Sequence, residues 1–71
     1  MKSFGQVLAS YLEELDISQS KLARRMGTGR QTVNNLLRDA GRGPTLVTAI
    51  AIAAALGVPI QEMVERMNEK E

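Results

Sequence analysis

The sequence predicts an all-α domain of five short helices. Apolar residues recur every three or four positions, which is helical spacing, and no stretch has the pattern of a strand. Serine or threonine precedes most of these stretches, and glycine follows two of them, as is typical of helix ends. The 71 residues fit a single domain, 1–71. The predicted helices span residues 4–15, 19–26, 29–38, 46–56 and 60–67.

The first two predicted helices each begin after a serine. Ser3 and Gln6 have the spacing of a capping box, in which each side chain bonds the backbone N–H of the other residue. Ser18 is the predicted cap of the second helix. The apolar face of the first helix is predicted at Phe4, Val7, Leu8, Tyr11, Leu12 and Leu15. That of the second is predicted at Leu22, Ala23 and Met26.

The later helices have similar boundary signals. Thr28 and Gln31 form a second predicted capping box, which would open the third helix. Thr45 is predicted to cap the fourth helix and Gly57 to end it, with a loop at residues 39–44 before it. The inner faces of the third and fifth helices are predicted at Val33, Leu36 and Leu37 and at Ile60, Met63, Val64 and Met67.

The residue types absent from the chain exclude several kinds of chemistry. Without cysteine or histidine, it can form neither a disulfide nor a thiolate or imidazole metal site. Nucleophiles paired with histidine are excluded too, and Glu13 and Glu14 lie on a predicted exposed helix with no pocket-forming motif beside them. We therefore expect neither an enzyme nor a bound cofactor or metal.

Two further observations concern the place of the protein in the cell and the kind of molecule that it binds. The longest uncharged run, residues 43–61, is broken by Gly57 and Pro59, and no stretch has the form of a signal peptide, so we expect a cytoplasmic protein without a membrane span. Residues 21–42 carry a net charge of +5, whereas the segments on either side each carry −2. This basic block suggests a polyanionic partner, although an ordinary solvated face would carry the same charge.

Residues 19–38 meet the requirements for two helices that cross steeply and are joined by a tight turn. Ala23 provides the small residue at the crossing point, and Gly27 provides the residue that can take a positive φ in the turn. Val33 and Leu36 anchor the second of these helices on the first. The stretch is therefore predicted to be a helix-turn-helix.

This stretch resembles the lambdoid phage repressor and Cro type of helix-turn-helix protein. The resemblance rests on residues 19–28, with the sequence QSKLARRMGT, and on Val33 and Leu36. It continues through Pro44, Thr45, Leu46, Ile50, Ile52, Ala53, Leu56, Gly57 and Val58, which look like the fourth helix of that family and its exit. The resemblance covers about residues 4–67 and implies a five-helix lambda-repressor-like DNA-binding domain of prokaryotic or phage origin.

The resemblance also implies which residues contact DNA. The third helix would lie in the major groove, while the second would cross the phosphate backbone. Base edges would be read by Arg30, Gln31, Thr32, Asn34 and Asn35. Phosphates would be bound by Gln19, Lys21, Thr28, Arg38 and Arg42. Arg24 and Arg25 could also bind phosphates or could be solvated on the far side of the second helix.

The chemistry of the third helix supports this assignment independently. With Val33 facing inward and about 100° between successive residues, Gln31 and Asn35 point outward. Arginine can pair with guanine, and glutamine and asparagine can pair with adenine, each through two hydrogen bonds. The helix has no glutamate to repel phosphates. The sequence differs from its relatives at two positions. Gly29 has no side chain to contact a base where relatives often have one, and Arg30 favours a DNA site that contains guanine.

The fourth predicted helix is too apolar for the surface of a lone small domain. It has no charged residue, and so small a core cannot bury all of its side chains, although exposed alanine is also tolerated. We expect a homodimer, whose interface would comprise Val47, Ala51, Ala54, Ala55, Met63 and Met67. Leu46, Ile50, Ala53 and Leu56 are the expected core residues of this helix.

A dimeric repressor that occupies a near-palindromic operator on double-stranded DNA is therefore the predicted function. Two alternatives remain open. One is an antitoxin, which would bind DNA and also mask a toxin protein. The other is a helical protein-interaction module without DNA binding, against which the basic block argues.

Overall fold

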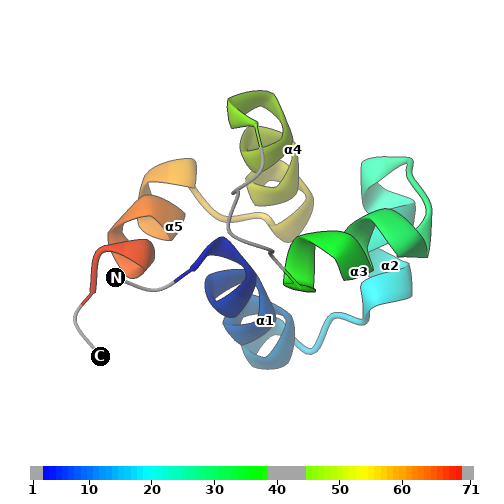
Figure 1. The fold of residues 1–71 in the computed structure, drawn as a ribbon, viewed down its shortest axis with the longest axis horizontal. Helices are drawn as coiled ribbons and strands as arrows, with labels where there is room; N and C mark the ends of the chain where they lie inside the picture. Colours follow the sequence, from blue (N-terminus) through cyan, green and yellow to red (C-terminus); the bar gives the residue numbers. More distant parts are fainter. Residues whose placement is uncertain (1–2, 39–44, 70–71) are drawn as a thin grey trace.

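The computed structural model describes residues 3–38 and 45–69. These residues form five helices, α1 (Phe4–Leu15), α2 (Gln19–Met26), α3 (Arg30–Arg38), α4 (Leu46–Leu56) and α5 (Ile60–Met67). In Figure 1, α2 and α3 lie together at one end of the molecule and α5 lies at the other, with α1 and α4 between them. The all-α prediction is confirmed, and four of the five helices have the predicted bounds.

Side chains cap three helices as predicted. The Ser3 hydroxyl accepts from the Gln6 N–H at 3.2 Å, and Gln6 Oε1 accepts from the Ser3 N–H at 3.0 Å, which completes the first capping box. The hydroxyls of Ser18 and Thr45 each accept from the backbone N–H three residues later, at 3.0 and 3.2 Å. These bonds satisfy N–H groups that have no partner within the helix.

The capping box predicted at Thr28 is wrong. The third helix begins one residue later than expected, so Gly29 directly precedes its first turn. Thr28 belongs to the preceding turn instead, because its N–H donates to the Ala23 carbonyl at 2.9 Å. The side chain of Gln31, the other predicted member of the box, donates to Asn35.

Among the described residues, three helices end at a residue with a left-handed backbone. Gly27 ends α2 with φ 72° and Gly57 ends α4 with φ 76°, as predicted. Asp16 ends α1 with φ 56°, where the sequence predicts the end of the helix but not its left-handed backbone. Aspartate adopts this conformation more readily than most residues with a Cβ, but less readily than glycine.

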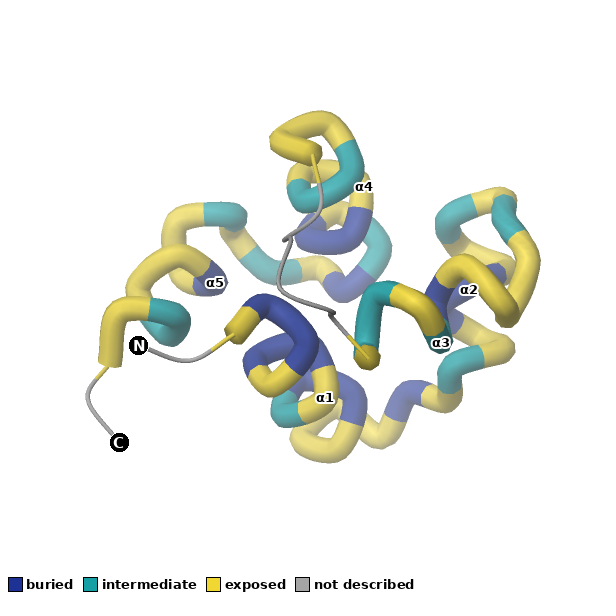
Figure 2. Tube along the Cα trace, viewed as in Figure 1, coloured by how far each residue is buried: buried dark blue, intermediate teal, exposed yellow. Residues whose placement is uncertain are grey.

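One apolar core joins all five helices, and Figure 2 shows its buried positions turned toward the centre of the molecule. The core residues are Phe4, Val7, Leu8, Tyr11, Leu12, Ile17, Leu22, Ala23, Val33, Ile52, Ala53, Leu56 and Met63. The prediction for α4 is partly wrong, because Leu46 and Ile50 are 73% and 49% exposed and Ile52 is buried. A helix that is apolar on every side gives no periodic signal to locate its inner face.

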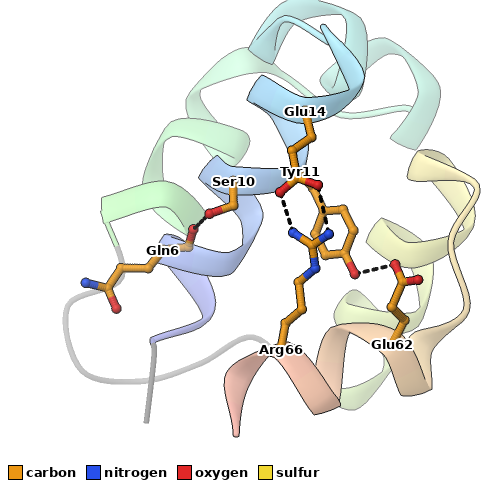
Figure 3. Close-up of polar contacts among 6 residues, drawn as sticks. All are labelled: Gln6, Ser10, Tyr11, Glu14, Glu62 and Arg66. Carbon is orange, nitrogen blue, oxygen red and sulfur yellow. Dashed lines mark hydrogen bonds and ion pairs between the residues drawn. The ribbon is translucent and has the colours of Figure 1, made fainter. Parts of the chain in front are cut away.

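Polar contacts fasten α5 to α1, as Figure 3 shows. The Tyr11 hydroxyl donates to Glu62 Oε2 at 2.6 Å, and the Arg66 guanidinium donates to both carboxylate oxygens of Glu14 at 2.5 and 2.8 Å. Burial raises the pKa of Tyr11 to about 12, and its hydrogen bond to Glu62 acts in the same direction. The bond to Glu14 raises the pKa of Arg66 above its already high value. These contacts hold the last helix of the domain against the first.

Candidate nucleic-acid interface

The turn between α2 and α3 is built as the sequence predicts. Gly27 takes the positive φ, and its N–H donates to the Arg24 carbonyl at 3.2 Å. Ala23 is buried on α2, which packs on both α3 and α4, so a larger side chain there would disturb this packing. Val33 is completely buried and anchors α3 from beneath. The face of α3 opposite Val33 is therefore held outward.

That outward face carries the predicted base-reading residues. Arg30, Gln31, Thr32 and Asn35 are exposed, and Asn34 is half-buried at the flank. All of these side chains are polar, and no carboxylate occurs in α3. A face made of arginine, glutamine, asparagine and threonine offers directed donors and acceptors without repelling a polyanion.

A shallow open hollow lies between α2 and α3. It is lined by Gln19 from α2 and by Arg30, Gln31 and Asn34 from α3. Gln19 is 11 or more positions away from the other three in sequence, so the fold brings a predicted phosphate-binding residue beside predicted base-reading ones. Gly29 adds no side chain here, and a Cβ at that position would meet open space.

Three of the remaining predicted phosphate-binding residues lie among the described residues. Lys21 and Arg38 are exposed, and Thr28 is half-buried in the turn. Arg42 lies outside the described residues. Arg25, whose role was left open, donates from Nη1 to the carbonyl of Ala55 at 3.0 Å. Arg25 therefore fastens α2 to the carboxyl end of α4, where a cation also suits the helix dipole.

The exposed apolar surface of α4 is larger than predicted, and some of its residues are not the predicted ones. The exposed predicted residues are Val47, Ala51 and Ala54, and they are joined by Leu46 and Ile50. Met63 is only 1% exposed, so its predicted place on the inner face of α5 is confirmed and its predicted place in the interface is wrong. Val64, also predicted on the inner face, is 48% exposed. Ala55 and Met67 are half-buried and pack against the core, so they contribute little exposed surface.

Neither a metal-ligand cluster nor a single membrane-spanning helix occurs among the described residues. Residues 3–38 and 45–69 contain no group of three or more acidic side chains placed to hold a metal ion. No single helix among them is long and apolar enough to cross a membrane. Helices α4 and α5 together have the length and composition, but the chain bends by 110° between them.

Comparison with known proteins identifies the arrangement. A family model described as helix-turn-helix matches residues 8–63. Repressor protein C of Rhizobium phage 16-3 is 41% identical over 69 residues, which cover 97% of this chain and 26% of that protein. The chain thus spans about a quarter of the length of this relative. The chain therefore belongs to the helix-turn-helix family of DNA-binding domains, of the phage repressor and Cro type.

Proposed function

We propose that this protein is a sequence-specific transcriptional repressor that binds double-stranded DNA as a dimer. The observation that carries the proposal is the outward face of α3, where Arg30, Gln31 and Asn35 stand exposed opposite the buried Val33. An α-helix fits the major groove of B-DNA, and these side chains are the ones that pair with purines there. The likeness to a phage repressor supports the same role.

Base reading is assigned to the exposed side chains of α3. Arg30 suits the O6 and N7 acceptors of guanine, whereas Gln31 and Asn35 suit the donor and acceptor of adenine. Thr32 and Asn34 lie beside them and complete the reading face. We therefore expect guanine and adenine at neighbouring positions of each half-site.

Phosphate binding is assigned to the residues around this face. Lys21 on α2 and Arg38 at the end of α3 contribute charge, and Gln19 and Thr28 contribute neutral donors. Arg42 is assigned to the same role from its position in the sequence. These contacts fix the position of α3 in the groove but do not distinguish one sequence from another.

Dimerisation is assigned to the exposed apolar surface of α4, which comprises Leu46, Val47, Ile50, Ala51 and Ala54. A second subunit that covers this surface would remove large aliphatic side chains from water. This would add to the low free energy of unfolding of a small domain. A two-fold dimer would present two copies of α3 one DNA turn apart, which matches a near-palindromic operator.

The same α4 surface favours one second candidate, an antitoxin that binds a toxin protein there. The two candidates differ in what the isolated chain does. A homodimeric repressor sediments as a dimer by itself, whereas an antitoxin whose α4 surface is reserved for a toxin sediments as a monomer until the toxin is added.

Selection of bound duplexes from a random pool tests the proposed function. We expect a near-palindromic site, with half-site centres about 10 base pairs apart and with G·C and A·T pairs at the positions that α3 reads. The proposal fails if no sequence is enriched at low ionic strength, where phosphate contacts are strongest.

A further inference from the structure

A hydrogen bond joins two exposed amides on the reading face of α3. Gln31 Nε2 donates to Asn35 Oδ1 at 3.2 Å, between residues one helical turn apart. Both residues lie on the surface opposite Val33. Since they stand in the middle of the proposed reading face, the orientation of one amide depends on the other.

This bond determines which groups of Gln31 remain available to DNA. A side-chain amide has one acceptor oxygen and two N–H donors. Gln31 uses one N–H on Asn35, which leaves its oxygen and its other N–H. In the major groove adenine presents one donor, at N6, and one acceptor, at N7, so it matches this remaining pair. Guanine presents two acceptors there and would leave the Gln31 oxygen without a donor.

We propose that Gln31 and Asn35 form one reading unit for a single adenine–thymine base pair, in which Gln31 contacts adenine and Asn35 orients the Gln31 amide. This inference rests on the proposed binding of α3 in the major groove. Asn35 is then a positioning residue rather than an independent reader. Because the Gln31 amide is already held before DNA arrives, less conformational freedom is lost on binding.

Arg30 lies beside this unit but takes no part in its hydrogen bond. Arg30 lines the hollow together with Gln19, Asn34 and Gln31, whereas Asn35 does not line it. Arg30 is exposed, and the hydrogen bond between the amides does not involve it. Arg30 is therefore available for a different base pair, and the Arg30→Ala variant provides a matched control.

The test measures affinity of the full chain for its selected duplex and for all single base-pair replacements in one half-site. Gln31→Ala, Asn35→Ala and the double variant are compared with the unmodified chain. We expect each single variant to lose most of the discrimination at one and the same A·T pair, which for two good hydrogen bonds is about 5- to 150-fold. The double variant should lose no more discrimination than the larger single loss.

The controls separate this inference from the proposed function. If the unmodified chain prefers no duplex over random DNA, the proposed function fails, and this inference fails with it. If it does prefer one, Arg30→Ala should relax discrimination at another base pair. Alanine forms helix better than glutamine or asparagine, so both variants should fold, as circular dichroism will verify.

The inference alone is overturned by either of two results. In the first, Asn35→Ala retains the full preference at the base pair that Gln31→Ala relaxes. In the second, the two single variants relax different base pairs and their losses multiply in the double variant, as two independent readers require.

Discussion

The guanidinium carbon of Arg66 lies 4.1 Å from the centroid of the Tyr11 ring, so a cation on α5 covers an aromatic face on α1. The Tyr11 ring is 2% exposed, whereas the Glu14 side chain that pairs with the same guanidinium is 53% exposed. Water and salt therefore screen the ion pair more than the contact with the ring. Since α1 also packs against α3, this contact stabilises the helix on which α3 rests.

Arg66→Ala should lower the free energy of unfolding by about 1–2 kcal/mol, since a cation over an aromatic ring and a partly exposed ion pair each contribute up to about 1 kcal/mol. Urea unfolding followed by circular dichroism measures the change. Arg38→Ala, at an exposed position of α3, is the control and should change stability little. Equal stability of Arg66→Ala and the unmodified chain would show that the contact is not stabilising.

Tyr11→Phe should change how stability depends on alkaline pH. The pKa of Tyr11 is raised from 10.0 to about 12 by burial and by the bond to Glu62. Between these values the unfolded chain loses the phenol proton while the folded chain keeps it, so stability is full below pH 10 and declines toward pH 12. The phenylalanine variant lacks this decline.

Unfolding midpoints at pH 8 and between pH 10 and 11.5 measure this effect. At pH 8 the variant should be less stable by about 0.5–1.5 kcal/mol, the contribution of one hydrogen bond. The difference in stability between the variant and the unmodified chain should become smaller as the pH rises. A difference that stays constant over this range would contradict the raised pKa of Tyr11.

Asp16→Asn should stabilise the protein by about 0.3–1 kcal/mol. Asp16 ends α1 with a left-handed backbone, which asparagine also tolerates, and its charge lies at the negative end of the helix dipole beside Glu13 and Glu14. Thermal unfolding in low salt measures the gain, and added salt should reduce it because the effect is electrostatic. A lower unfolding midpoint would indicate that the Asp16 carboxylate has a stabilising partner.

Features that depend on local sequence patterns could be predicted from the sequence. Ser3, Ser18, Gly27 and Gly57 mark helix ends by chemistry that acts within one turn, and they lie where predicted. The outward direction of Gln31 and Asn35 followed from helical geometry once Val33 was placed inside. The base-reading assignment itself remains a prediction.

Contacts between distant segments were not predictable in the same way. The contacts of Arg66 and Glu62 with α1 and the bond from Arg25 to Ala55 join residues 30 or more positions apart, and no local pattern marks them. Met63 illustrates the same limit, because its spacing fits a core position and an interface equally well. Only the packing of α5 assigns it to the core.

Ala23→Glu and Ala51→Glu place the same side chain at a buried and an exposed position of two helices. Ala23→Glu should prevent folding, because it buries a charge without a partner in the core. Ala51→Glu should fold but weaken the proposed dimer, since Ala51 lies on the exposed face of α4. Circular dichroism and sedimentation equilibrium measure the two effects. A dimer of unchanged strength in Ala51→Glu would exclude this face as the interface.

The most direct test of the account compares Arg30→Ala with the unmodified chain on the selected operator and on random duplex DNA. If the outward face of α3 reads bases, the variant loses about 1–3 kcal/mol of binding free energy on the operator and clearly less on random DNA. Equal losses on both would show that Arg30 contributes only charge and would contradict base reading by this helix.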